Sequence, residues 1–190
     1  MTEQEASGAI EDLFSDVYKR NLWGGAAGGF CSGPGSAEAL TEPYCVWLAA
    51  FIATRCGGAA TVVDLGCGDF RVGRRLMALA PGIDYVGVDV VPELIADNTR
   101  RYAGPRVSFR QADIAVDVLP PGDICLIRQV LQHLSNAQIA RIVARLARYR
   151  YVFVTEHYPA RVLVLNVDKP TDTRTRRRQA SAVDLAAPPF

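Results

Sequence analysis

The chain has no pair of cysteines spaced as C-x-x-C, no apolar run of membrane-spanning length and no large excess of either charge. Its five cysteines are scattered along 190 residues, which favours reduced thiols over a disulfide framework or a zinc site. The apolar segment 45–56 is too short to cross a bilayer and contains Arg55. The formal net charge of +1 gives no field that would attract nucleic acid or an anionic membrane. We therefore expect no metal, no nucleic-acid partner and no membrane association.

The composition is typical of a globular protein. Hydrophobic residues make up 49% of the chain and charged residues 22%, which argues against disorder. A length of 190 residues suits one domain with a sizeable core. The first residues are polar and acidic, unlike a signal peptide. We expect a soluble cytoplasmic protein, and the sequence leaves its oligomeric state open.

Three segments differ in composition. Residues 1–41 hold a short helical pattern followed by a glycine-rich stretch, which is interpreted either as a lid over a site or as an exposed connector. Residues 42–168 alternate strand and helix patterns and form the main domain. Residues 169–190 are a tail that contains arginines and prolines. Its run from Arg174 to Arg178 is expected to be solvated and partly mobile.

The main segment predicts an α/β fold. Its strand patterns are continuous apolar runs, typical of parallel strands buried on both faces, so we expect a Rossmann-like, doubly wound, mostly parallel sheet with helices on both faces. The segment 162–165 is a possible sixth strand, and little after it resembles a strand, so the final strand pair is expected to be incomplete. The predicted strands are 61–65, 84–89, 106–110, 123–127 and 150–155, and the predicted helices are 42–56, 70–80, 92–102 and 136–148.

Two neighbouring strands end in a carboxylate, and a glycine turn follows the first. The run VVDLGCG contains Asp64, Gly66 and Gly68, and the run YVGVD ends at Asp89. Glycine permits positive φ and lets a ligand approach the backbone closely. A carboxylate at the tip of the second strand can accept both hydroxyls of a ribose. Because the carboxyl ends of adjacent parallel strands meet, the pattern predicts a nucleotide-type pocket.

Two other interpretations of this pattern are weaker. A dinucleotide site, as in a nicotinamide-dependent oxidoreductase, needs G-x-G-x-x-G, and Arg71 stands at the third glycine position. The other interpretation is an incidental glycine turn, with Asp89 as a helix cap before Pro92. It does not explain why Asp64 also stands at a strand tip beside the turn. The predicted pocket requires that Asp64 and Asp89 face one hollow and that the ring of Phe70 does not fill it.

The segment Val62–Gly68 resembles the first motif of class I S-adenosylmethionine-dependent methyltransferases, and the resemblance continues in order to His157. Many members of that family carry a third glycine where this chain has Phe70. The acid and the aromatic residue after Gly68, together with the segment Arg128–Leu134, resemble a small bacterial subgroup of stand-alone methyltransferases. The resemblance implies a Rossmann-like fold and S-adenosyl-L-methionine as the cofactor.

The same resemblance implies which residues bind the cofactor. The methionine moiety would lie over the glycine turn, and the ribose would bind the acid that ends the second strand. The residues after the third strand would flank the adenine, and the end of the fourth strand would supply further contacts. The implied cofactor-binding residues are Asp64, Gly66, Gly68, Asp89, Val90, Asp113, Ile114 and Arg128.

Histidine is scarce, and both histidines follow a predicted strand at the edge where the pocket must lie. Methyl transfer is a direct displacement, so an enzyme chiefly positions the acceptor and needs a base only if the acceptor must lose a proton. Because histidine titrates near neutral pH, we predict His133 and His157 as catalytic residues. The alternative for His133 is a structural or capping role at the start of a helix.

The predicted function is methyl transfer from S-adenosylmethionine to the oxygen or nitrogen of a small-molecule acceptor. A small molecule is preferred because the chain has no separate recognition domain and its net charge does not favour nucleic acid. The alternative is a non-catalytic subunit, derived from a methyltransferase, that only binds the cofactor or serves as a scaffold.

Overall fold

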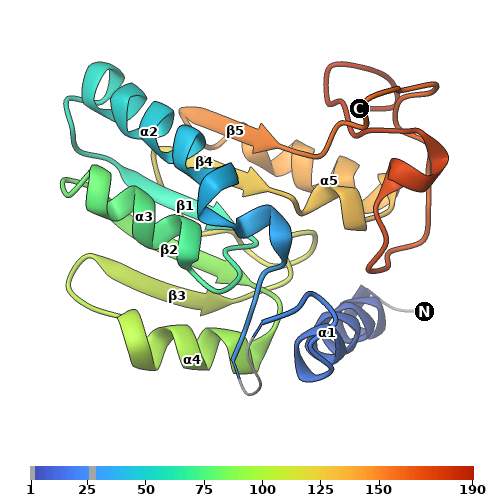
Figure 1. The fold of residues 1–190 in the computed structure, drawn as a ribbon, viewed down its shortest axis with the longest axis horizontal. Coiled ribbons are helices and arrows are strands. Elements are labelled where there is room, and N and C mark those ends of the chain that lie inside the picture. Colours follow the sequence, from blue (N-terminus) through green and yellow to red (C-terminus); the bar gives the residue numbers. More distant parts are fainter. Residues whose placement is uncertain (1–2, 26–28) are drawn as a thin grey trace.

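Five parallel strands form one sheet in the order β3-β2-β1-β4-β5 (Figure 1). The computed structural model describes residues 3–25 and 29–190. The order and the uniform parallel direction confirm the predicted Rossmann-like α/β fold. The strands are β1 (Thr61–Leu65), β2 (Asp84–Asp89), β3 (Val107–Gln111), β4 (Ile124–Arg128) and β5 (Tyr151–Thr155). The α-helices are α1 (Glu3–Lys19), α2 (Glu38–Arg55), α3 (Arg71–Leu79), α4 (Pro92–Tyr102) and α5 (Asn136–Leu146). Three short 3₁₀ helices are η1 (Pro34–Ser36), η2 (Leu131–His133) and η3 (Arg176–Gln179).

Different helices cover the two faces of the sheet. Successive side chains of a strand point to opposite faces, and on β1 this separates Val62 from Val63. Val62 packs in a cluster with residues of α2 and α3, whereas Val63 packs in a cluster with residues of α5. Both strand faces are therefore buried, which explains why the strands are continuous apolar runs in the sequence.

The carboxyl ends of the strands meet at one edge, and α1 lies across that edge (Figure 1). The register places Leu65 of β1 beside Val88 of β2 and Ile127 of β4, so the glycine turn, Asp89 and Arg128 come together. Helix α1 is joined to this edge by polar contacts. The side-chain amide of Gln111 donates to Glu11 at 3.1 Å, and Lys19 forms an ion pair with Glu93 at 3.0 Å.

The possible sixth strand at 162–165 is not formed. These residues make bends and a turn, with the side chains of Leu163 and Val164 exposed, so β5 is the last strand of the described chain and the sheet ends without a further strand pair. A second difference concerns α2, which begins at Glu38 rather than at residue 42 and therefore holds Pro43 inside the helix. None of the described helices is both long and apolar enough to cross a membrane.

The expectation of a solvated C-terminal tail is wrong for the centre of the arginine run. The side chain of Arg176 is only 1% exposed, and Ser181, Ala182 and Val183 are buried as well. Val183 joins the cluster that α5 forms with the sheet. Figure 1 shows the C-terminal segment folded beside α5. The segment thus completes the edge of the domain instead of leaving it.

Candidate active site

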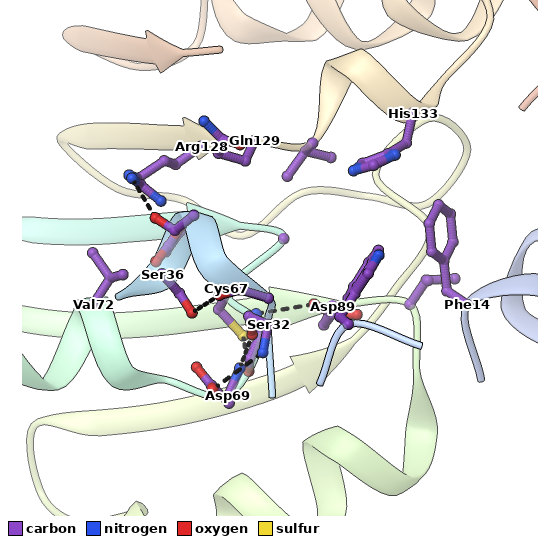
Figure 2. A pocket seen from close by; sticks show the side chains of 18 of the residues that line it. Phe14, Ser32, Ser36, Cys67, Asp69, Val72, Asp89, Arg128, Gln129 and His133 are labelled. Atoms are coloured by element: carbon purple, nitrogen blue, oxygen red, sulfur yellow. Dashed lines mark hydrogen bonds between the residues drawn. The ribbon is translucent and has the colours of Figure 1, made fainter. Parts of the chain in front are cut away.

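A cavity of about 290 Å³ lies at the carboxyl edge of the sheet (Figure 2). This is where open parallel sheets bind ligands, and the volume is close to the lower end of the range of roughly 300–1,000 Å³ for small-molecule sites. It is lined by the ends of β1, β2 and β4 together with α1, the segment 32–36 and η2. The structure brings to this cavity every cofactor-binding residue that the resemblance implied and one predicted catalytic residue, namely Asp64, Gly66, Gly68, Asp89, Val90, Asp113, Ile114, Arg128 and His133.

The glycine turn needs glycine because other parts of the chain cross closely above it. Gly66 has φ +88° and Gly68 has φ +55°, a region that side chains with a Cβ avoid. A Cβ on Gly66 would overlap Cγ2 of Val130, and a Cβ on Gly68 would overlap Oγ of Ser32. From the sequence we expected the glycines to allow close approach of a ligand. In the structure they allow close approach of the loop after β4 and of the N-terminal segment.

Asp89 shapes the turn as well as facing the cavity. Its carboxylate accepts hydrogen bonds from the backbone N–H of Gly68 at 3.0 Å and of Val91 at 3.2 Å. The carbonyl of Gly68 accepts from Asn98 at 2.7 Å. Burial raises the pKa of Asp89 above its ordinary value, against the lowering effect of these N–H donors. The carboxylate is thus held rigidly at the floor of the cavity.

Asp64 faces the same cavity from the end of β1. Its Oδ2 accepts a hydrogen bond from Tyr85 Oη at 2.6 Å, and burial raises its pKa to about 6. Phe70 does not line the cavity. Its ring packs under the turn against Tyr85, Tyr102 and Phe109, with ring centroids 5.0, 5.2 and 5.0 Å away. Both conditions for the predicted pocket are therefore met.

The N-terminal segment covers the glycine turn. The backbone N–H of Ser32 donates to Asp69 at 3.2 Å, and the backbone N–H of Asp69 donates to Ser32 Oγ at 2.7 Å. Further along, the carbonyl of Gly35 accepts from Arg128 Nη2 at 2.8 Å. These contacts favour the lid over the exposed connector for residues 32–36, while residues 26–28 of the same stretch lie outside the described chain.

His133 lies at the end of the cavity opposite Arg128 in Figure 2. Its ring is 5.6 Å from that of Trp23 and 6.1 Å from that of Phe14, measured between centroids. Burial lowers the pKa of His133 to about 4, and Lys169 adds to this effect. The imidazole is therefore neutral at physiological pH. Its Nδ1 is buried and has no hydrogen-bond partner.

His157 is not brought to the cavity. It follows β5, which is the edge strand, and it is absent from the cavity lining. Burial and, to a smaller extent, the nearby guanidinium of Arg177 lower the pKa of His157. The expectation that His157 lines the acceptor site is corrected by this geometry.

Glu156, which follows β5, anchors the loop that carries His133, and sequence reasoning did not identify it. Its Oε1 accepts from the backbone N–H of Val130 at 2.9 Å and of Leu131 at 2.7 Å, and its Oε2 accepts from that of Gln132 at 3.3 Å. Burial raises the pKa of Glu156 to about 7. The only signal in the sequence was an acid directly after an apolar strand.

Replacing Glu156 by glutamine should change how stability depends on pH. The folded-state pKa of about 7 exceeds the ordinary 4.5, so between these values the folded chain binds more protons than the unfolded chain. The free energy of unfolding should therefore fall as pH rises through this window, by at most about 3 kcal/mol. In Glu156→Gln this contribution to the fall should be absent. Urea unfolding at several pH values measures this difference, and replacement of the exposed Glu38 by glutamine is the control. The same slope of unfolding free energy against pH in both variants would contradict the prediction.

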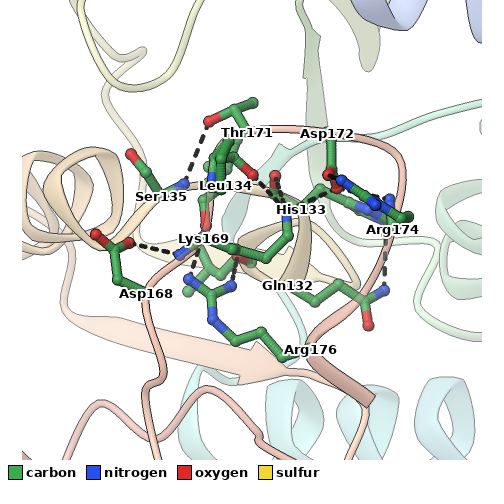
Figure 3. A network of polar contacts seen from close by, with 12 residues as sticks. Gln132, His133, Leu134, Ser135, Asp168, Lys169, Thr171, Asp172, Arg174 and Arg176 are labelled. Atoms are coloured by element: carbon green, nitrogen blue, oxygen red, sulfur yellow. Dashed lines mark hydrogen bonds and ion pairs between the residues drawn. The ribbon is translucent and has the colours of Figure 1, made fainter. Parts of the chain in front are cut away.

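The C-terminal segment holds the same loop from the other side (Figure 3). The guanidinium of Arg176 donates to the carbonyls of Leu131 at 3.1 Å, Leu134 at 2.8 Å and Val167 at 2.9 Å. Lys169 Nζ donates to the carbonyl of His133 at 3.1 Å. Two buried cations therefore bind the carbonyls of η2 while Glu156 binds its N–H groups.

Comparisons with known proteins agree with this geometry. Residues 62–150 match the protein family described as a methyltransferase domain. A curated relative, trans-aconitate 2-methyltransferase from Methylobacterium nodulans, is 40% identical over 90 residues, which are 47% of this chain and 33% of that protein. The chain thus spans about a third of the length of this relative.

Two solved structures share the fold. The 1,6-didemethyltoxoflavin-N1-methyltransferase of Burkholderia thailandensis, with 1,6-didemethyltoxoflavin and S-adenosylhomocysteine bound, has a TM-score of 0.55 and 21% identity over 81% of this chain and 64% of that chain. The magnesium protoporphyrin IX methyltransferase of Synechocystis, with S-adenosylhomocysteine bound, has a TM-score of 0.55 and 17% identity over 74% of this chain and 66% of that chain. At these identities the likeness concerns the fold.

Proposed function

Because residues 62–150 match a family model described as a methyltransferase domain, we propose that this chain is a class I S-adenosylmethionine-dependent methyltransferase that transfers a methyl group from S-adenosylmethionine to the oxygen or nitrogen of a small-molecule acceptor. One observation carries the proposal. Buried side-chain polar atoms are nearly always hydrogen-bonded in folded proteins. In the described chain, every buried side-chain nitrogen or oxygen that lacks a partner belongs to a residue of the cavity, namely Tyr44, Asp113, Arg128, Gln132 or His133.

These unpartnered atoms and the neighbouring carboxylates fit the cofactor group by group. Asp89 is placed to accept the ribose hydroxyls, and Asp113 Oδ2 is free to accept the adenine amino group. At the other end, Arg128 Nε is free to donate to the methionine carboxylate, and Asp64 attracts the ammonium group. When bound, the cofactor would supply a methyl group on a positively charged sulfur, and the sulfur would leave as a lone pair of the acceptor attacks the methyl carbon.

The charge of the cavity also suits a cationic cofactor better than an anionic acceptor. Asp64, Asp69, Asp89 and Asp113 line it, and Arg128 is the one lysine or arginine among the described lining residues. The name of the curated relative gives trans-aconitate, a tricarboxylate, as its acceptor. Three carboxylates would require several cations in a buried site, so we propose an acceptor of a different kind for this chain.

Calorimetry with S-adenosylmethionine and S-adenosylhomocysteine tests the cofactor, and transfer of a labelled methyl group to metabolites of a cell extract tests turnover. We expect binding of both nucleosides and at least one labelled product. Binding without any transfer would favour the non-catalytic subunit. Absence of binding would exclude both the methyltransferase and a non-catalytic subunit that binds the cofactor.

Substituting Asp89 should weaken the cofactor site. Asp89→Ala is expected to reduce S-adenosylhomocysteine affinity by roughly 1–3 kcal/mol, or about 5-fold to 150-fold, because two ribose hydroxyls and the N–H of Gly68 lose their acceptor. Asp89→Asn keeps one acceptor oxygen and should lose less. Calorimetry gives the affinities, and thermal unfolding checks that each variant is folded. An unchanged dissociation constant in Asp89→Ala would mean that Asp89 only caps the turn.

A further inference from the structure

One end of the cavity is walled by rings. Trp23 lies 5.4 Å from Tyr18, 6.2 Å from Phe14 and 5.6 Å from His133, measured between ring centroids. All four residues line the cavity, and we refer to them as the aromatic wall. Figure 2 shows Phe14 and His133 side by side at this end. Three of the rings come from the N-terminal segment, and the fourth comes from η2.

Among the described residues that line the cavity, the aromatic wall itself contains no lysine or arginine. Arg128 lies at the opposite end in Figure 2, where it donates to Gly35 and stacks over Tyr44. Lys169 is close to His133 but does not line the cavity, and its ammonium is engaged by backbone carbonyls and by Asp172 at 2.9 Å. An anionic group placed on the wall would lose its hydration without gaining a counter-ion.

The polar atoms beside the wall call for a group that can both donate and accept. Gln132 Oε1 has no partner and is an acceptor. His133 Nδ1 has no partner either, and in a neutral imidazole each ring nitrogen is either donor or acceptor, depending on the tautomer. A hydroxyl or an amine satisfies both tautomers and also the glutamine oxygen. A carboxylate can only accept.

We propose that the methyl acceptor is an uncharged aromatic molecule with a hydroxyl or amino group, whose ring packs on the aromatic wall and whose nucleophilic atom lies beside His133. This inference rests on the proposed function. The acceptor lone pair forms the bond to the methyl carbon, and the carbon–sulfur bond breaks with its electrons remaining on sulfur. The neutral imidazole of His133 takes up the proton that the acceptor loses. Aromatic rings gain packing energy against such a wall beyond their buried area.

The chain offers an optical readout for binding at the wall. It has two tryptophans, of which Trp23 lines the cavity while Trp47 is 52% exposed on α2. Trp47→Phe therefore leaves Trp23 as the single reporter. With S-adenosylhomocysteine saturating, this variant is titrated with p-cresol, with 4-hydroxyphenylacetate and with 4-methylcyclohexanol. The second probe adds a carboxylate to the first, and the third removes its aromaticity.

We expect p-cresol to change the emission of Trp23 and to bind at least about tenfold more tightly than either other probe. Equal or tighter binding of the carboxylate or of the alicyclic alcohol would overturn the proposal. An emission that p-cresol leaves unchanged would overturn it too. Failure of S-adenosylhomocysteine to bind in calorimetry would instead contradict the proposed function, so the two failures are distinguishable.

Phe14→Leu separates an acceptor wall from an adenine-stacking wall. It should weaken p-cresol by about 2-fold to 10-fold, as expected for loss of one aromatic contact, and leave the affinity for S-adenosylhomocysteine unchanged. Phe51→Leu, on α2 outside the cavity, is the matched control and should alter neither. An equal loss of both ligands in Phe14→Leu would assign the wall to the cofactor and overturn the proposal.

Discussion

Arg176→Met is expected to lower the free energy of unfolding by about 3–5 kcal/mol. The side chain is 1% exposed, and its guanidinium satisfies the carbonyls of Val167, Leu131 and Leu134 and the side-chain oxygen of Asn136. Methionine fills similar space but leaves these buried acceptors without donors, each of which costs about 1–3 kcal/mol with incomplete additivity. Urea denaturation measures the loss.

Arg178→Met is the matched control two residues along. Arg178 is exposed, so its replacement should change the free energy of unfolding by no more than about 0.5 kcal/mol. Because Arg176 binds the carbonyl of Leu131 in η2, Arg176→Met should also impair the proposed methyl transfer under conditions where the variant is still folded. Equal stability of the two variants would contradict the stabilising role of the buried Arg176 side chain and would instead support a solvated run of arginines.

Gly66→Ala should also have a large effect, lowering the free energy of unfolding by about 2–6 kcal/mol. Positive φ costs a residue with a Cβ about 1–3 kcal/mol, and Gly66 has φ +88°. The new methyl would also overlap Cγ2 of Val130, and overpacking of this kind costs about 1–3 kcal/mol more. Cofactor affinity should fall as well, because the turn and the loop after β4 are pushed apart.

A double-mutant cycle with Val130→Ala separates the two causes. Removing the valine methyl groups should relieve the overlap but not the backbone strain, so Gly66→Ala should cost less in the Val130→Ala background. Gly104→Ala is the control, since a Cβ there meets nothing within 4 Å. The prediction is wrong if Gly66→Ala is no more destabilising than Gly104→Ala. If the effects of Gly66→Ala and Val130→Ala are additive, backbone strain at positive φ alone accounts for the loss of stability.

Three groups hold one short loop beside the cavity. Glu156 binds the N–H groups of residues 130–132, and Arg176 and Lys169 bind the carbonyls of η2. The loop places Val130 over the glycine turn and His133 in the aromatic wall. The loop therefore connects the end of the cavity proposed for the cofactor with the end proposed for the acceptor. A C-terminal segment with little secondary structure thus has a defined role next to the cavity.

Local patterns in the sequence were sufficient to predict the sheet and the end of the cavity formed by the glycine turn and the strand-tip acids. The strand predictions agree with β1 to β5 to within one residue at each end, because parallel strands buried on both faces must be continuous apolar runs. The glycine turn and the acids Asp64 and Asp89 were likewise readable, since each depends on a few adjacent residues at a strand tip. Their convergence follows from the meeting of carboxyl ends in any parallel sheet.

The other end of the cavity is built from contacts between segments that are far apart in the sequence. No local pattern predicted that Arg176 would reach Leu131, from which it is separated by 45 positions. Nor did any predict that Phe14 and Trp23 would meet His133. Sequence reasoning also placed His157 at the site, from which the edge position of β5 removes it. Local propensity and periodicity act over a few residues, whereas these contacts depend on how distant segments pack, and packing is settled by the whole chain.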